Sequence, residues 1–435
     1  MRIIPILFFG FLLFFSVLAL HGEAVLTSPD EIAAYGAEHN LDYKNSQLNV
    51  LRAEDNRVSI LQLKDSSISF DLSVLKNLGE SSIYQDSHTG LGFSSTLSIP
   101  IIEQISFSAK ISDDFSGDLE FSLNPLAHSS TSKESEISYN SAMISAESSL
   151  TSAEVNAIES ALDWMSSNRD LSASKRESEL AELQYNDDKV RYDQGEITLE
   201  ELQDSLINWS EARVIHSVYE LDFRASESDL YKTLGSGSDM VRVDLMDVVD
   251  LEKYLAILKN SLDPQSMDPL KNKDYLISVL NVQSAEVVLK NTWTYEPGLE
   301  ADAGLSFDSS GNLSLAAGIN FSISPDDFQK KKRDIAEEEF NISLNEAEQS
   351  LYQAELEFEQ VIESIGSSSI NSEISRLEFE QTKILLLEAE LLHKLGEFSE
   401  VDLNESQLTL TKADNSLFKA LADEYSAWLE LKKNL

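Results

Sequence analysis

The sequence predicts a mainly α-helical protein with a smaller β-sheet part, built from two similar halves. Three observations predict this. Short patterns recur in the same order in both halves, two long segments are almost free of proline and glycine, and the residues before each of them alternate between apolar and polar. A repeat period near 200 residues means that the repeating unit is a whole subdomain rather than a solenoid repeat.

Three recurring patterns define how the two halves correspond. They begin at Asp42 and Asp274 (D-Y-x-x-S-x-L-N-V-x-x-A-E), at Phe121 and Phe321 (F-S-x-x-P), and at Gly195 and Gly396 (G-E-x-x-x-x-x-L). The offsets are 232 (274 − 42), 200 (321 − 121) and 201 (396 − 195), so the first half holds 32 additional residues (232 − 200) before Phe121. We therefore expect a first repeat at 25–235, with one additional hairpin, and a second repeat at 236–435.

Residues 1–24 have the features of a secretory signal peptide. Met1-Arg2 precedes an apolar stretch that ends at Leu20, and Ala24 is a suitable small residue for cleavage. An uncleaved anchor is the alternative, but the stretch is short and no basic flank follows it. No later apolar run approaches 18 residues, so a membrane-embedded part has to be a β-barrel.

Composition excludes several classes of function. The chain has no cysteine, which excludes disulfides, thiolate metal sites and cysteine nucleophiles. Its formal net charge of −43 makes nucleic acid and anionic lipid poor partners. Metalloprotease, phosphate-binding-loop and nucleophile-elbow motifs are absent, and the six histidines are scattered. We expect no enzyme, no cofactor and no metal site.

The elements of each half follow in one order. Ser28-Pro29 is a capping hydroxyl with a proline in the first turn, and it begins a helical segment at about 28–65. Alternating residues then predict β-hairpins at about 66–125, and the second half repeats one hairpin at about 297–323. The additional residues at about 66–95 are interpreted as added strands or an extracellular loop, with a periplasmic excursion as a further alternative. Strands near 10 residues match the length that crosses a tilted bilayer.

Each half ends in a very long helical hairpin. Residues from about 130 to Gly195 contain no proline or glycine, and those from about 326 to Gly396 contain one glycine, Gly366. Helices of this length span roughly 100 Å and are typical of coiled coils or helical tubes. Return helices are expected at about 199–234 and 399–433, and the apolar stripes on these helices are expected to pack against other helices.

The predicted strands cannot close a barrel within one chain. A chain offers about four equivalent strands, whereas a small membrane barrel needs at least eight. The chain is therefore expected to oligomerise, which also removes exposed strand edges.

This combination of duplication, strand pairs and long helices resembles the TolC-like outer-membrane efflux proteins over about residues 25–435. Three local patterns carry the likeness: Leu26–Ala33 at the opening helix, Tyr192–Leu202 at one helical tip and Gly396–Leu403 at the other. The resemblance implies a homotrimer in the bacterial outer membrane, with about four transmembrane strands per chain closing a 12-stranded barrel and the helices forming a periplasmic tunnel.

The resemblance also implies a function. Such a protein is a passive exit duct for small molecules or polypeptides, as part of a tripartite efflux pump or a type I secretion system. Its partners would be a periplasmic adaptor, an inner-membrane pump or ATPase, and outer-membrane lipid. A trimeric coiled-coil surface protein without transport is the alternative reading of the residues, and a periplasmic adaptor is a third, although an adaptor has one helical hairpin rather than two.

Acidic pairs follow both tip glycines. In the family, acidic side chains at such places ring the constriction of the tunnel, which implies a gating role for Glu201, Asp204, Asp402 and Glu405. Residues at i and i+3 share one helix face, so each pair points the same way. The alternative is that acids near a helix start only interact with the helix dipole.

The tip turns themselves are expected at Gly195 and Gly396. The family often has a small or basic residue directly after this glycine for adaptor contact, whereas this chain has glutamate at both positions. Arg191 and Lys394, just before the turns, are the alternative candidates for adaptor contact.

Overall fold

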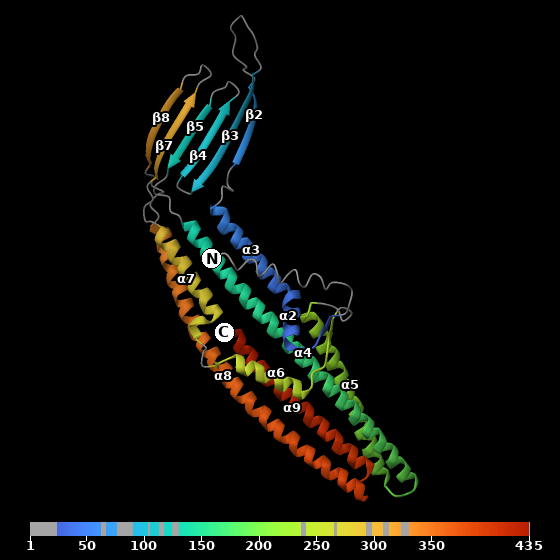
Figure 1. Ribbon diagram of the computed structural model, residues 1–435. Helices are drawn as coiled ribbons and strands as arrows, with labels where there is room; N and C mark the ends of the chain where they lie inside the picture. Colours follow the sequence, from blue (N-terminus) through green and yellow to red (C-terminus); the bar gives the residue numbers. More distant parts are fainter. Residues whose placement is uncertain are drawn as a thin grey trace. The chain divides into compact units, whose positions relative to one another are not determined.

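The structure is a computed structural model, and the chain divides into two compact units (Figure 1). The first comprises Met1–Ser46, Ala146–Asn272 and Gln353–Leu435, and the second comprises Gln47–Ser145 and Lys273–Tyr352. The residues described are 24–61, 67–75, 90–102, 105–112, 117–123, 130–235, 241–264, 268–292, 298–307, 313–322 and 330–434. Each unit takes residues from both predicted repeats, so this division does not test the repeat boundaries at 235 and 236.

The predicted helical framework is confirmed. The described helices are α2 (Pro29–His39), α3 (Leu41–Leu61), α4 (Ser130–Asp193), α5 (Leu199–Thr233), α6 (Val248–Ser261), α7 (Lys273–Asn291), α8 (Lys330–Leu395) and α9 (Glu400–Asn434), with a short 3₁₀ helix, η2 (Pro269–Lys271). The two long helices have 64 and 66 residues, and both return helices have 35. The fold class is therefore mainly α, as the sequence predicts.

The first helical segment begins as expected and then divides. The Ser28 hydroxyl accepts a hydrogen bond from the Glu31 backbone N–H at 3.3 Å, and Pro29 occupies the first turn. The predicted helix at 28–65 is broken at Asn40, which has an extended backbone. The Asn40 side chain accepts a hydrogen bond from Tyr43 N at 2.9 Å, so it caps the start of α3 as α2 ends.

The core of the first unit lies along α9. Phe418, Leu421, Leu429 and Leu431 are almost fully buried there, and they belong to one cluster with side chains of α2, α4, α5 and α6. A short parallel pair, β1 (Ala24–Leu26) with β6 (Val241–Val243), joins this core. Of the predicted signal peptide, residues 1–23 lie outside the described part of the chain, and Ala24 begins β1.

Sequence reasoning missed α6. Asp247 caps this helix by accepting a hydrogen bond from Asp250 N at 2.8 Å, and Leu251 and Leu255 are buried on its inner face. The cap and the i, i+4 leucines were the available signals. Leu234 is the C-cap of α5, and Gly235 follows it with φ 63°, in the left-handed region that commonly ends a helix. Residues 236–240 lie outside the described part of the chain.

The second unit contains an antiparallel sheet of six strands in the order β2-β3-β4-β5-β7-β8 (Figure 1). Their bounds are β2 (Ser67–Leu75), β3 (Gly90–Ile102), β4 (Ile105–Ser112), β5 (Gly117–Leu123), β7 (Gly298–Phe307) and β8 (Leu313–Ser322). The count exceeds the four expected because the additional residues of the first half form the hairpin β2–β3. The interpretation of that segment as added strands is thus confirmed for 67–75 and 90–95, while 76–89 lie outside the described residues.

The strand register separates apolar from polar positions. On β7 and β8, Leu305 pairs with Leu315 and Ala301 with Ile319, whereas Ser306 pairs with Ser314 on the alternate face. The same alternation continues through β5, where Leu119 pairs with Leu305. Leu315 and Ile319 are 76% and 78% exposed, and Leu119 is 40% exposed. One face of the sheet is therefore apolar without being covered at these positions.

Among the described helices, none is both long enough and apolar enough to cross a bilayer.

The close approach of α2 to α4 predicts an opposite response of two helical glycines to alanine. A Cβ at Gly36 would lie 2.4 Å from the Ala157 Cβ, whereas a Cβ at Gly366 in α8 would meet nothing within 4 Å. We expect Gly36→Ala to lower stability by about 1–3 kcal/mol through overpacking. Gly366→Ala should raise it by about 0.5–1 kcal/mol because alanine has the lower backbone entropy cost.

Thermal unfolding of the detergent-solubilised protein, followed by circular dichroism, measures both changes. Equal shifts in the melting temperatures of the two variants would contradict the close α2–α4 contact.

Candidate functional site: helical tips and seams

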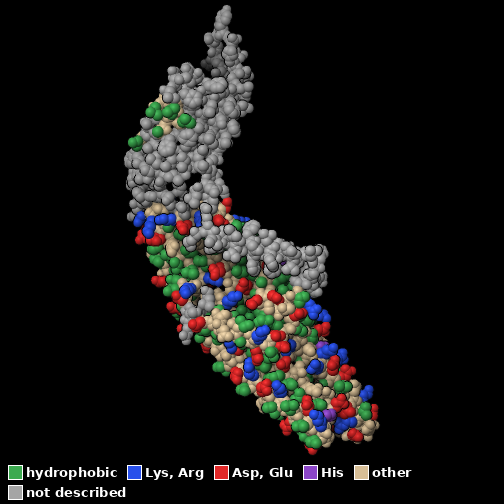
Figure 2. All heavy atoms as spheres, viewed as in Figure 1, with side chains coloured by type: hydrophobic (Ala, Val, Ile, Leu, Met, Phe, Trp, Pro, Cys, Tyr) green, Lys and Arg blue, Asp and Glu red, His purple; other side chains and the backbone are tan. Residues whose placement is uncertain are grey.

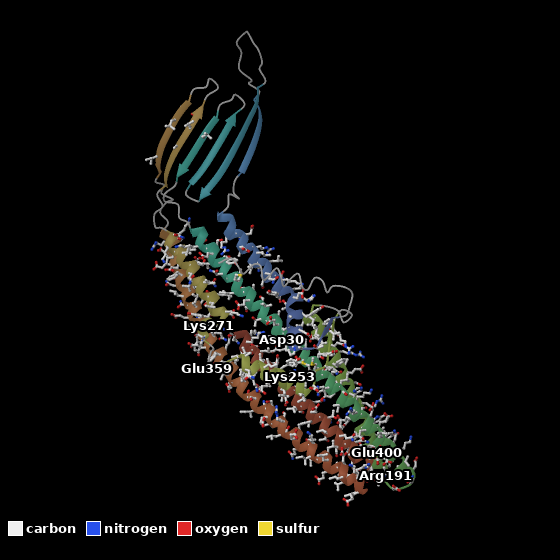
Figure 3. The ribbon with its side chains drawn as sticks, viewed as in Figure 1. Asp30, Arg191, Lys253, Lys271, Glu359 and Glu400 are labelled. Atoms are coloured by element: carbon white, nitrogen blue, oxygen red, sulfur yellow. The ribbon has the colours of Figure 1, made fainter. Side chains whose placement is uncertain are left out.

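Both hairpins turn with the same backbone motif. Gly195 and Gly396 adopt φ of 73° and 80°, in the left-handed region that favours glycine. The glutamate after each glycine donates its N–H to a carbonyl five residues earlier, Arg191 O at 2.8 Å and Leu392 O at 2.9 Å. These bonds form a Schellman motif that satisfies the last carbonyls of α4 and α8. The two predicted tip turns thus lie where the long helices end, and Figure 3 labels Arg191 and Glu400 at this end of the first unit.

Glu201 forms a capping box at the start of α5. Its carboxylate accepts hydrogen bonds from the Thr198 backbone N–H at 2.7 Å and the Thr198 hydroxyl at 2.9 Å, and the hydroxyl accepts one from Glu201 N at 3.3 Å. These bonds lower the pKa of Glu201 below its ordinary value. The Thr-x-x-Glu spacing was the sequence signal for this role.

Asp402 forms the equivalent capping box with Ser399 at the start of α9. Its carboxylate accepts hydrogen bonds from the Ser399 hydroxyl at 2.7 Å and the Ser399 backbone N–H at 2.8 Å. The pKa of Asp402 is lowered by the hydroxyl and then by the backbone N–H. A local structural role therefore accounts for the position of both Glu201 and Asp402.

The other two predicted gate residues are placed differently. Asp204 is exposed on α5, one turn beyond the capping box. Glu405 is exposed on α9 and accepts a hydrogen bond from Gln184 of α4. No hydrogen bond found among the described residues joins the Glu201–Asp204 pair to the Asp402–Glu405 pair within one chain.

The candidate adaptor residues also differ from each other. Arg191 forms ion pairs with Asp188 at 3.1 Å and Glu196 at 3.6 Å, so part of its charge is neutralised at the first tip. Lys394 is exposed in the last turn of α8. At the second tip the His393 ring hydrogen-bonds with the Phe398 carbonyl at 3.0 Å.

Polar contacts join α4 to α9 within the chain. Arg169 pairs with Asp414 at 2.8 Å, donates to the Met246 carbonyl at 3.2 Å and lies 4.2 Å over the Phe418 ring. Further along the same seam, Lys412 pairs with Glu177 at 2.8 Å. These residues were not singled out from the sequence, because nothing in their spacing links positions about 245 residues apart.

Glu424 is the most buried carboxylate described. It is 2% exposed on α9 and accepts hydrogen bonds from Lys259 of α6 and Ser372 of α8, each at 2.6 Å. Burial by itself raises the pKa of Glu424, but the hydrogen bonds from Lys259 and Ser372 outweigh it, so the pKa is lowered overall. The carboxylate therefore ties α6 and α8 to α9 in its ionised form.

This network predicts a pH-dependent effect of Glu424→Gln. A carboxyl with a lowered pKa stabilises the fold above its unfolded pKa of about 4.3, and this contribution disappears as the pH falls through the folded pKa. We expect a loss of about 1–3 kcal/mol at pH 7, typical of hydrogen bonds to charged groups.

The difference between the Glu424→Gln variant and the original protein should shrink below about pH 4. Urea unfolding at pH 7 and pH 4 measures it. The half-exposed Glu430, which pairs with Lys433 one turn away, supplies the matched control Glu430→Gln on the same helix. A difference that is the same at both pH values would contradict the ionised network.

A polar cavity of about 570 Å³ lies between α4, α5 and α9. Asp163, Asp170 and Asp423 line it with Lys419, and burial raises the pKa of all three carboxyls while Lys419 opposes the shift. No group of three or more ligating side chains able to hold a metal ion is found among the described residues.

Apolar side chains at coiled-coil spacing remain exposed on two helices. They recur every seven residues and are each more than half exposed: Ile207, Val214 and Leu221 on α5, and Ile370, Leu377, Ile384 and Leu391 on α8. Heptad spacing is typical of a seam between helices. Figure 2 shows hydrophobic side chains interspersed with acidic ones over the visible helical surface. We name the two rows the α5 seam and the α8 seam.

Solved structures identify this arrangement. The fold matches that of CusC over 93% of this chain and 90% of the other, with a TM-score of 0.63 and 13% identity. It matches VceC from Vibrio cholerae over 93% and 94%, with a TM-score of 0.61 and 13% identity. It matches the open state of the MtrE outer membrane channel from Neisseria gonorrhoeae over 93% of this chain and 88% of the other, with a TM-score of 0.62 and 11% identity. The chain has the fold of these outer-membrane channels.

The TolC-like fold inferred from the sequence is thereby confirmed. No protein-family model and no curated protein sequence matches the chain. Identities of 11–13% establish the fold alone.

Proposed function

We propose that this chain is the subunit of an outer-membrane channel-tunnel, a passive exit duct through which cargo leaves a tripartite efflux pump or a type I secretion system. The observation that carries the proposal is the fold match over more than 90% of the chain to solved outer membrane channels, such as MtrE of Neisseria gonorrhoeae and CmeC of Campylobacter jejuni. The uncovered apolar face of the sheet supports the proposal. Leu315 and Ile319 are large apolar side chains that are exposed on this face, as side chains facing lipid would be.

The exposed seams support a homo-oligomer. Under the predicted repeat offset of 201 residues, Ile370 and Leu377 of α8 correspond to Arg169 and Arg176 of α4, which contact α9 within the chain. Val214 of α5 corresponds likewise to Asn415 of α9. The same packing repeated between copies would bring the α8 seam of one chain onto the α5 seam of the next. Three copies, as the family resemblance implies, would close the tunnel.

This arrangement predicts that a charge in the α8 seam disrupts assembly but not the fold of the chain. Ile384→Lys would bury an unpaired ammonium between copies, which is strongly unfavourable. We expect the association constant of the oligomer to fall by at least about tenfold, corresponding to roughly 1.4 kcal/mol or more. Lys383→Glu, an exposed neighbour outside the heptad row, is the control.

Native mass spectrometry in detergent measures the oligomer, and circular dichroism checks that helix content is unchanged. Oligomerisation of Ile384→Lys equal to that of the control would contradict the seam.

The tips would form the gate and the docking end of this channel. We propose that Asp204 and Glu405 contribute carboxylates to an acidic constriction, in which Glu201 and Asp402 take part while also capping their helices. An acidic ring favours cations and can bind them. Arg191 and Lys394 are the proposed contacts for a periplasmic adaptor, with an inner-membrane pump or ATPase beyond it.

Planar-bilayer conductance of the purified oligomer tests the proposal. We expect cation-selective channels that multivalent cations block. Asp204→Asn with Glu405→Gln should weaken the block, since neither residue caps a helix. Glu200→Gln, in the first turn of α5, is the control.

A protein that never conducts would contradict the channel and favour a trimeric coiled-coil surface protein. Unchanged block in the double variant would contradict the gate alone.

A further inference from the structure

The six-stranded sheet ends in two strands whose outer edges have no pairing partner among the described residues. These edges are β2 and β8, of nine and ten residues. Soluble proteins blunt such edges with lysine, proline, bulges or short strands. Here β2 has Asp71 as its one charged residue, and β8 has no charged residue and no proline. Both edges are therefore suited to pairing with another strand.

Strand direction points to a second copy of this chain as the partner. All neighbouring strands of the sheet are antiparallel, and the number of strands is even, so β2 and β8 run in opposite directions. The β8 edge of one copy can therefore join the β2 edge of the next as another antiparallel pair. The two strands also match in length, so such a junction would leave little backbone unpaired.

The alternation of residues continues across this junction. On β2 the register places Ile68, Phe70, Leu72 and Val74 on the face that leads through β3, β4, β5 and β7 to Leu315 and Ile319 on β8. Pairing β2 with β8 of the next copy would thus produce one uninterrupted apolar face around the ring. A barrel in lipid needs such a continuous outer face and no open edge.

The hairpin that supplies the β2 edge has no counterpart in the second half of the chain. Phe121 and Phe321, matched by their shared Phe-Ser-x-x-Pro pattern, lie in β5 and β8, so the hairpin β4–β5 corresponds to β7–β8. The hairpin β2–β3 is left over. If it lay outside the barrel wall, β4 would be the edge, and β4 also runs antiparallel to β8.

We propose that the hairpin β2–β3 is part of the barrel wall and forms the junction between copies, with β2 pairing with β8 of the next copy. Each chain then contributes six strands, and a trimer closes 18 strands (6 × 3) instead of the 12 expected from the sequence. This inference rests on the proposed channel function and its trimer. Because barrel diameter grows roughly linearly with strand number, the barrel would be about half as wide again, in the range of porins with an aqueous lumen.

Engineered disulfides test the junction, and the absence of natural cysteine makes every cross-link assignable. Ser69→Cys on β2 is combined in turn with Ala316→Cys, Gly318→Cys and Asn320→Cys on β8, all at polar-face register positions. Within one flat sheet, β2 and β8 are five strand spacings apart, roughly 24 Å, whereas a disulfide needs Cα atoms within about 7 Å. The products are therefore expected between chains.

The matched control replaces Ser69→Cys by Ser108→Cys on β4, with the same three β8 partners. After mild oxidation of the full-length oligomer, denaturing electrophoresis should show covalent dimers and trimers in at least one β2–β8 combination. The β4–β8 combinations should give at least about tenfold less, because β4 would be covered on both sides by its own chain.

Three results would overturn the inference: interchain products from β4–β8 and not β2–β8, an intrachain β2–β8 product, or no interchain product from any pair. Conductance of the cysteine-free protein distinguishes these from failure of the proposed function. A conducting protein whose β4–β8 pair cross-links is a channel with a 12-stranded barrel. A protein that does not conduct contradicts the function itself.

Discussion

The constraint on which the rest of this structure depends is that strand edges and apolar helix rows have no partner among the described residues of the chain. The sheet ends at β2 and β8, and the α5 and α8 seams are exposed at heptad positions. Unpaired strand edges and apolar seams are stable only when another surface covers them. Under the proposed channel function, further copies of the chain would cover both kinds of surface.

Within the chain, the first unit is held together by contacts of two kinds. The apolar cluster along α9 supplies most of the burial, and the polar contacts of Arg169 and Glu424 connect α9 to α4, α6 and α8. A buried carboxylate with its partners in place specifies which helices meet, whereas apolar burial alone tolerates alternatives. Apolar packing and ion pairs thus both join α4 to α9, whereas the exposed α5 and α8 seams are apolar rows.

At the tips, the same acidic residues are explained both by helix capping and by a role in gating. Glu201 and Asp402 are the capping residues of α5 and α9, and they stand at the places from which a gating role was inferred. In a capping box a side chain with an acceptor oxygen, most often Glu or Gln, stands three residues after Thr or Ser, so helix initiation alone can account for an acid at this position in both halves. Asp204 and Glu405 take no part in the capping hydrogen bonds, so helix capping does not explain why these two positions are acidic.

The sequence by itself determined the order of the long helices and of the hairpins, because hydrophobic period, glycine turns and long proline-free segments are local signals. Gly195, Gly396 and Ser28 were located correctly for this reason. Only the tertiary structure decided that the hairpin β2–β3 joins the sheet, that α6 packs on α9, and that Arg169 meets Asp414. These pairings link residues far apart in sequence, and their energy comes from burial and geometry that no single segment encodes.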